Sequence, residues 1–236
     1  IDQHSEPFEV YEELKNQPTA VYGNGITTFL SKPGLYKSIA AAKHLQALGG
    51  FKMVIAWVLA QQQSMRSYLQ LGVDAILTDL NDTETLLQVL NEPGFAGRFE
   101  LAQMGHNPFQ SAIPAYALTI KTSNSLFAGT DGQIRFSLTG KAGHIELIID
   151  AGMDGILEKD SVNYFAIEGK DIGEITSLTT EFVDGGVTSG WLAETIKIES
   201  QVHAPVTFTY GPNEWIDLQN KILIKAPDVN GNLLIK

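Results

Sequence analysis

The chain has 236 residues, of which 44% are hydrophobic, and a formal net charge of −11. Its length suits one large domain or two ordinary ones, and its hydrophobic fraction is that of a folded protein. The acidic charge argues against nucleic-acid binding and against purely electrostatic attachment to anionic lipid. The absence of cysteine excludes disulfides and zinc–thiolate sites.

No run approaches the roughly 20 apolar residues of a membrane-spanning helix, and no basic leader of the signal-peptide type opens the sequence. The first residue is Ile1 rather than Met. We therefore expect either that a leader was removed or that the sequence begins inside a longer chain.

The first part of the chain alternates between helical and strand-like patterns. Apolar residues recur at helical spacing in segments 7–17, 35–48, 61–71 and 82–90, and strand-like runs lie at 20–29, 52–59 and 75–78. Gly49 and Gly50 end the second helical segment, as glycine commonly does. This order of elements is typical of parallel β/α units.

After about residue 116 the helical patterns disappear. Short strand-like runs lie at 116–122, 134–140, 144–157, 162–167, 175–183, 191–200, 206–210 and 215–224. The turns between them contain Gly, Asp and Asn, which predicts an antiparallel β-sandwich. The joint near residues 105–114 contains two prolines, so we place the domains at 1–110 and 111–236.

Motifs in the first part resemble the end of a known barrel. They are NGIT at 24–27, MVIAW at 53–57, LGVDAILTD at 71–79, and RFELA followed by NPF within 98–109. The set is similar to the last three strands, and the tail after them, of the sphingomyelinase D and phospholipase D-like barrel, which belongs to the glycerophosphodiester phosphodiesterase group. The resemblance implies a TIM-type barrel with its chemistry at the C-terminal strand ends.

The resemblance also implies where along the chain the catalytic residues lie. In the family, two His act as general acid and base and acidic residues hold one Mg²⁺, all on the first strands. Those strands have no counterpart here, so we assign no catalytic residue to this chain and expect Mg²⁺ only in an intact parent. Asp74, at a strand entry, is interpreted as a structural cap.

Three residues are candidates for substrate binding, namely Trp57, Asp79 and Asn24. Trp57 matches an aromatic residue that lines the family's substrate mouth, with core packing as the alternative. Asp79 stands where Asn is usual and could instead orient the following loop, and Asn24 replaces an Asp. Ile55 and Ala60 also depart from the family pattern, which weakens any inference of sphingolipid specificity.

The number of barrel strands is itself informative. Three parallel strands cannot close a barrel, and they leave an apolar face and a strand edge without cover. We therefore expect that further residues precede Ile1 in the natural protein, or that the first part pairs with another chain.

Anchors in the second part occur in the order of a second family. They include FAGTD at 127–131, IRFSLTG at 134–140, LEKDSVNYF at 157–165, GWL at 190–192 and WID at 215–217. This succession resembles the PLAT domain of lipases and lipoxygenases. The resemblance implies an eight-stranded, non-catalytic sandwich that docks to membranes or to partner proteins.

Some PLAT domains bind Ca²⁺ through loop carboxylates and carbonyls, the ligands that calcium prefers. Asp131 and Asp184 match acidic positions of the family. Asn163 stands where an Asp is common, and Asp160 is a possible substitute for it. The alternative is that these Asp residues simply favour turns.

Leu126 and Phe127 precede the Gly-Thr-Asp turn of the PLAT part. At a loop tip they could insert into lipid, each contributing roughly 1.5–3 kcal/mol if fully buried there. The alternative is that Phe127 folds into the core.

Two functions follow from these patterns. The first is the C-terminal fragment of a secreted hydrolase, a phospholipase D or sphingomyelinase D-like phosphodiesterase with a PLAT domain for docking to phospholipid or to a partner protein. The second is a non-catalytic lipid- or protein-binding PLAT protein with a degenerate barrel remnant. A His and an acidic pair upstream of Ile1 would favour the first.

Overall fold

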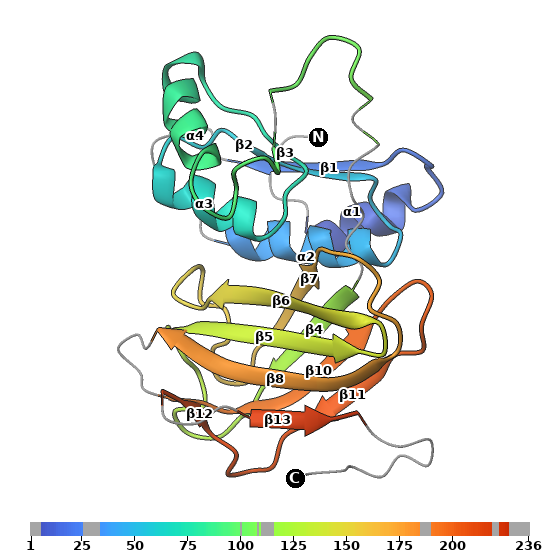
Figure 1. Cartoon of the computed structure of the whole chain (residues 1–236), viewed down its shortest axis with the longest axis vertical. Coiled ribbons are helices and arrows are strands. Elements are labelled where there is room, and N and C mark those ends of the chain that lie inside the picture. The colour runs from blue at the N-terminus through green and yellow to red at the C-terminus, as the bar shows by residue number, and fades with distance from the viewer. Residues whose placement is uncertain are drawn as a thin grey trace. The chain divides into compact units, whose positions relative to one another are not determined.

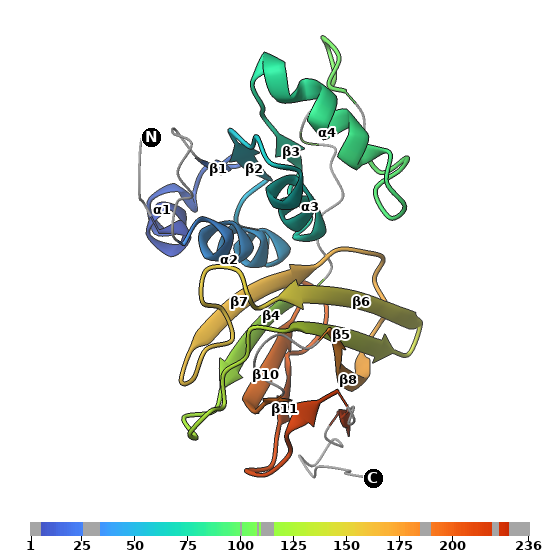
Figure 2. The ribbon, with the colours of Figure 1, turned by 90° about the vertical axis from the view of Figure 1, so that its left-hand side faces the viewer.

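The computed structural model describes residues 6–25, 34–99, 101–107, 109, 116–184, 190–218 and 222–226. The chain divides into two compact units, residues 1–113 (unit 1) and 114–236 (unit 2), and Figures 1 and 2 show their elements. In the described part of the chain, no helix is both long enough and apolar enough to cross a bilayer.

Unit 1 alternates helices and strands, as the sequence predicts. Its elements are α1 (Pro7–Leu14), β1 (Val21–Gly25), α2 (Leu35–Ala47), β2 (Met53–Trp57), α3 (Gln62–Gln70), β3 (Ala75–Ile76), the 3-10 helix η1 (Leu80–Asp82) and α4 (Thr83–Leu90). The strands form a parallel sheet in the order β1-β2-β3, with Gly25 in register with Trp57. Part of the predicted strand at 20–29, residues 26–29, lies outside the described residues.

The sheet of unit 1 is covered by helices on one face. Tyr22 and Val54 point to that face and are buried, and Figures 1 and 2 show α1 and α2 along it. On the other face Val21 is 37% exposed, and Met53 and Ile55 are only half-buried. Among the described residues, β1 and β3 each pair on one edge only. The described residues contain a three-stranded parallel sheet, and the partial TIM barrel stays a prediction.

Unit 2 is built from antiparallel strands. They are β4 (Tyr116–Thr122), β5 (Gln133–Gly140), β6 (Gly143–Asp150), β7 (Val162–Ile167), β8 (Ile175–Asp184), β9 (Gly190–Trp191), β10 (Ala193–Glu199), β11 (Val206–Thr209), β12 (Ile216–Asp217) and β13 (Ile222–Lys225). Two four-stranded sheets have the orders β11-β10-β4-β7 and β13-β8-β5-β6, and β12 pairs with β9.

The core of unit 2 is organised around Trp191. Its indole is fully buried and meets the Phe136 ring edge-on, with centroids 5.9 Å apart. Its Nε1 donates a hydrogen bond of 3.2 Å to Thr122 Oγ1, which satisfies the polar end of the ring as a buried Trp requires. Because Trp191 and Thr122 come from β9 and β4, this contact fixes both strands near the loop that follows β4.

Candidate functional site

Trp57 ends β2 at the C-terminal edge of the sheet of unit 1. A Cβ built on Gly23 would lie 3.6 Å from the indole Nε1, and one on Gly25 would lie 2.5 Å from its Cδ2 and 1.2 Å from the Trp57 carbonyl oxygen. The two glycines therefore make room for the indole against β1. Trp57 stays half-buried there.

Asn24 lies on the opposite face from Trp57, because successive side chains of a strand alternate. It is buried, and its Nδ2 donates to the Tyr22 hydroxyl at 3.1 Å. Burial raises the pKa of Tyr22, and the hydrogen bond with Asn24 lowers it in part. Asn24 thus faces the helices and not the same space as Trp57, so its predicted substrate contact has no geometric support.

Asp79 is exposed and follows β3. Its carbonyl accepts the Asp82 N–H at 3.0 Å, which starts η1. The preceding Thr78 donates to the Leu59 carbonyl at 2.7 Å and so joins the loops after β2 and β3. Trp57 and Asp79 therefore lie at the same end of the sheet, but nothing in the geometry brings the two side chains into contact, and their role stays a prediction.

Asp74 accepts the backbone N–H of Val54, as a structural cap does, and it is also one half of a buried ion pair. Its side chain is 2% exposed and lies 3.5 Å from Lys43 Nζ, which is fully buried. One oxygen accepts hydrogen bonds from Val54 N at 2.7 Å and from Gln46 Nε2 at 2.8 Å. The carboxylate thus fastens β2 to α2 at the sheet end away from Trp57.

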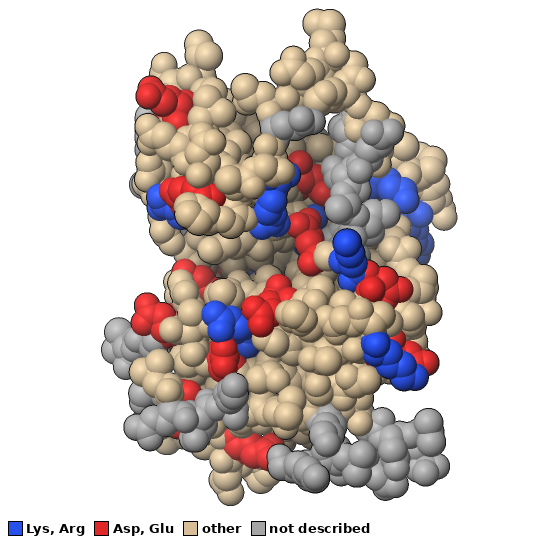
Figure 3. Space-filling view, viewed as in Figure 1, with Lys and Arg blue, Asp and Glu red and all other residues tan. Residues whose placement is uncertain are grey.

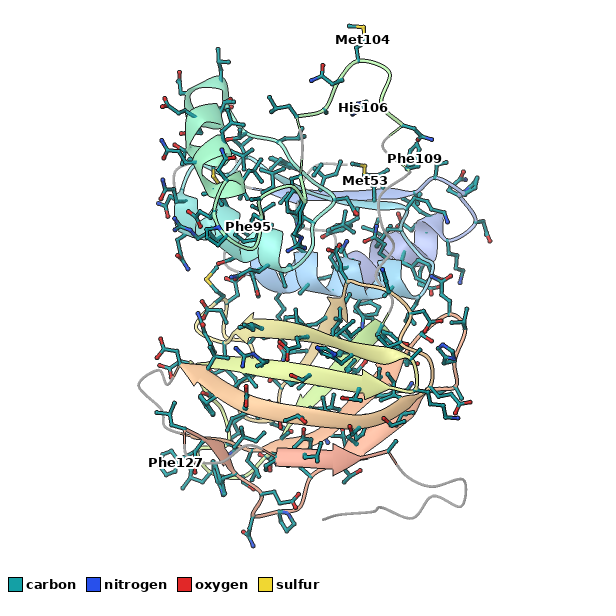
Figure 4. All side chains as sticks on the ribbon, viewed as in Figure 1. Met53, Phe95, Met104, His106, Phe109 and Phe127 are labelled. Carbon is teal, nitrogen blue, oxygen red and sulfur yellow. The ribbon has the colours of Figure 1, made fainter. Side chains whose placement is uncertain are left out.

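A cavity of about 600 Å³ lies beside β3 and α4. Met53, Ile76 and Leu86 are among the apolar side chains in its wall, and Arg98 and His106 contribute polar ones. Figure 4 shows Met104 and His106 on the loop on the far side of Met53 from α2. No sequence pattern indicated this cavity, because its walls come from five separate segments: β2, α3, β3, α4 and the loop after α4.

The loop between β4 and β5 presents two apolar side chains to solvent. Leu126 is 70% exposed and Phe127 is 77% exposed, and Figure 4 shows Phe127 pointing away from the sheets. We call this pair the apolar tip. Phe127 therefore does not fold into the core. Its φ of 63° lies in the left-handed region, which is unfavourable for a non-glycine residue.

Hydrogen bonds fix the backbone before and after the apolar tip. Ser123 Oγ accepts the Ser125 N–H at 3.1 Å, and the Ser125 carbonyl accepts the Ala128 N–H at 3.2 Å. Buried Ala128 in turn accepts the Leu192 N–H at 3.1 Å, and Leu192 accepts the Ser123 N–H at 2.9 Å. These hydrogen bonds fix the backbone of the turn, and the side chains of Leu126 and Phe127 remain exposed to solvent.

The three predicted calcium ligands, Asp131, Asp160 and Asp184, are all exposed at the same end of unit 2. Asp160 has a φ of 60°, and its amide donates to the Ser123 carbonyl at 3.1 Å. In the described part of the chain, no three His, Cys, Asp or Glu side chains gather in a way that could hold a metal ion. The three carboxylates do not form such a group, and calcium binding by unit 2 stays a prediction.

A polar cluster lies at the opposite end of unit 2 from the apolar tip, and no sequence motif predicted it. The Tyr116 hydroxyl lies 2.9 Å from both Asp171 Oδ1 and the Gly173 carbonyl, and it accepts the Ile172 N–H at 3.2 Å. His203 Nε2 lies 2.8 Å from Asp171 Oδ1. Burial, followed by the contact with Asp171, raises the pKa of Tyr116 to about 12. The Gly173 amide first, and then His203 and Tyr116, lower the pKa of Asp171.

Comparisons with known proteins follow the division into units. Residues 2–109 match the family model "Dermonecrotic toxin SPH", and residues 116–224 match "PLAT/LH2 domain". Dermonecrotic toxin LiSicTox-alphaIVA1 of Loxosceles intermedia is 31% identical over 97 residues, which cover 41% of this chain and 31% of the toxin. Dermonecrotic toxin SpaSicTox-betaIIA1 of Sicarius patagonicus is 38% identical over 61 residues, covering 26% and 22%.

Among solved structures, coral 8R-lipoxygenase is similar over 48% of this chain and 17% of its own, with 22% identity and a TM-score of 0.43. The chain spans only 22–38% of the length of the curated relatives named here and of a third, from Sicarius peruensis. Both resemblances noted in the sequence are confirmed: the chain joins a region that matches the model of the SPH family of dermonecrotic toxins to a region that matches the PLAT/LH2 domain model.

Proposed function

We propose that this chain is the C-terminal part of a secreted phospholipid phosphodiesterase of the phospholipase D or sphingomyelinase D class. In this proposal unit 1 supplies the last strands of the barrel, and unit 2 docks the enzyme on a lipid surface through the apolar tip. Relatives that carry the name of toxins support a secreted protein, since a toxin acts outside the cell that makes it.

The observation that carries the enzyme proposal is the one-sided sheet of unit 1. Its helix-free face holds half-buried or exposed apolar residues, among them Val21 and Ile55, and its described edges end at β1 and β3. A segment of about 150–200 residues would complete a barrel of the usual size and cover that face. The same segment would bring the His pair and the Mg²⁺-binding acids, none of which we assign to residues of this chain.

Activity measurements separate the fragment from its parent. We expect residues 1–236 alone to show no turnover of lysophosphatidylcholine in the presence of Mg²⁺, while a parent extended upstream of Ile1 cleaves it. Turnover by the isolated chain would contradict the proposal. In the active parent, Trp57→Ala should raise KM more than it lowers kcat if the indole lines the substrate mouth.

The docking proposal rests on the apolar tip. Burying one such side chain in lipid is worth roughly 1.5–3 kcal/mol, so Leu126→Ser with Phe127→Ser should weaken vesicle binding by about 100-fold or more. The measurement is co-sedimentation of the full chain with phosphatidylcholine vesicles. Val202→Ser is the control, because Val202 is 72% exposed but follows the opposite end of β10. Equal binding by the tip variant and the control would overturn the proposal.

A second candidate is a non-catalytic lipid- or partner-binding PLAT protein that carries a barrel remnant. The location of the apolar tip within unit 2 favours it, as do the departures from the family pattern at Ile55 and Ala60. Reading the coding frame upstream of Ile1 discriminates between the two candidates. If the coding sequence upstream of Ile1 encodes no His and no acidic pair, the enzyme proposal is excluded and the binding function is retained.

A further inference from the structure

The turn between β3 and α4 contains the sequence Asn81-Asp82-Thr83, which has the Asn-X-Thr pattern of an N-glycosylation acceptor. In this pattern the acceptor is the Asn side-chain nitrogen, and a Ser or Thr is required two positions later. No other Asn in the 236-residue sequence has Ser or Thr at that spacing. An N-linked glycan on this chain would therefore have a single attachment point.

The fold leaves the acceptor side chain available. Asn81 lies in η1 and is exposed, and no hydrogen bond in the described part of the chain holds its side chain. The turn is held by its neighbours instead, because the Asp79 carbonyl accepts the Asp82 N–H at 3.0 Å and the Thr83 hydroxyl at 3.4 Å. A sugar attached to Asn81 Nδ2 would therefore disturb no described contact.

Two large apolar side chains are exposed between the end of β3 and the acceptor. Leu77 is 56% exposed and Leu80 is 89% exposed. On the face of unit 1 seen in Figure 3, most described atoms belong to uncharged residues, so the hydration of that face depends little on charge. Exposed apolar residues that lie together promote association with other molecules, whereas a glycan is bulky and hydrophilic.

We propose that Asn81 carries an N-linked glycan when the chain passes through a secretory pathway, and that this glycan shields Leu77 and Leu80. The bond that forms joins Asn81 Nδ2 to C1 of the first sugar. The bond that breaks joins that carbon to the diphosphate of a lipid-linked oligosaccharide donor, and the amide loses one proton. The proposal rests on the secreted part of the proposed function and adds a modification site to unit 1.

Intact mass tests the attachment. The full chain is secreted from insect cells behind an added signal sequence, and we expect its mass to exceed the sequence mass by one glycan. PNGase F should remove this glycan and convert residue 81 to the acid. Asn81→Gln and Thr83→Ala should lack the added mass, and the conservative control Thr83→Ser should keep it. A wild-type chain secreted without the added mass would overturn the proposal.

Binding of the dye ANS, which reports exposed apolar surface, tests the shielding. Removal of the glycan by PNGase F should raise dye binding by the wild type at least twofold, and should leave it unchanged in Leu77→Ser with Leu80→Ser. The matched control is Leu126→Ser with Phe127→Ser, which removes the apolar tip of unit 2 and should show the same rise as the wild type. Equal rises in the two double variants would refute the shielding.

These readouts are separate from those of the proposed function. The mass and the dye signal require neither turnover nor vesicle binding. An inactive parent, or a chain that does not bind vesicles, would therefore count against the proposed function and leave the glycan on Asn81 in place. A secreted but unmodified chain that still binds vesicles would count against the glycan alone.

Discussion

At the scale of single residues, Asp74 shows how a side chain near the sheet can serve stability alone. Its carboxylate is enclosed by the Lys43 ammonium, the Gln46 amide and the Val54 N–H. Removing one partner of a buried ion pair leaves the other charge buried without compensation. The sequence pattern placed Asp74 directly before a strand. Periodicity does not show which helix packs against the start of that strand, so the ion pair with Lys43 could not be predicted.

We therefore expect Asp74→Ala to lower the free energy of unfolding of unit 1 by about 3–5 kcal/mol. Urea unfolding followed by the helical circular dichroism signal measures it, because the described elements of unit 2 are all strands. Glu92→Ala is the control: it breaks the pair with Arg66, which is about one-third exposed, and should have a much smaller effect. Similar losses in the two variants would contradict a buried role for Asp74.

At the scale of elements, the sequence predicted strands well wherever each strand alternates within one sheet. It was less accurate where a strand leaves its sheet. The predicted strand at 144–157 ends at Asp150, and the predicted strand at 191–200 is divided at Leu192, whose N–H is taken by Ala128 of a distant loop. Apolar residues continue through both breaks, so hydrophobicity alone does not mark them.

The polar cluster around Tyr116 ties the start of β4 to the connection between β7 and β8, and it makes unit 2 sensitive to alkali. The pKa of Tyr116 is raised in the folded state from 10.0 to about 12. Folding therefore opposes ionisation of the hydroxyl. The stability that this contributes is complete below pH 10 and is lost as pH rises toward 12.

We expect the wild type to lose about 3 kcal/mol of stability across that pH range through this group, and Tyr116→Phe to lose less. Chemical unfolding at a series of pH values measures the difference. Some loss should persist in the variant, because burial also raises the pKa of Tyr210. Parallel pH profiles for the two proteins would show that Tyr116 does not carry the effect.

At the scale of the whole molecule, element order predicted a helix-and-strand part followed by a part built from strands alone, and the described elements confirm it. The resemblance of the ordered motifs predicted a PLAT region, and the match of residues 116–224 to the PLAT/LH2 model confirms it. Contacts between distant segments could not be predicted from them. The sequence identified Leu126 and Phe127 but left the direction of Phe127 open, since both core and tip positions take aromatic residues. The resemblance pointed to Asp131 and Asp184 by family position and to Asp160 as a substitute near Asn163, and the described side chains form no group of three acidic or histidine residues around a metal site.

Calcium stays a proposal for unit 2, and its removal has a defined expectation. Because the three carboxylates do not converge, any affinity should be weak, with a Kd of about 10⁻⁴–10⁻³ M as in weak extracellular modules. Vesicle binding through the apolar tip should then survive EGTA. Loss of binding in EGTA, restored by calcium in the wild type but not in Asp131→Asn, would instead make the metal part of docking.

The left-handed backbone at Phe127 sets stability and binding against each other within a single residue. Glycine adopts a φ of 63° without the steric penalty that a Cβ brings. Phe127→Gly should thus raise the melting temperature of unit 2 or leave it unchanged, while it weakens vesicle binding about tenfold or more. Under the docking proposal, the exposed ring of Phe127 gains more in lipid binding than its left-handed backbone costs in stability.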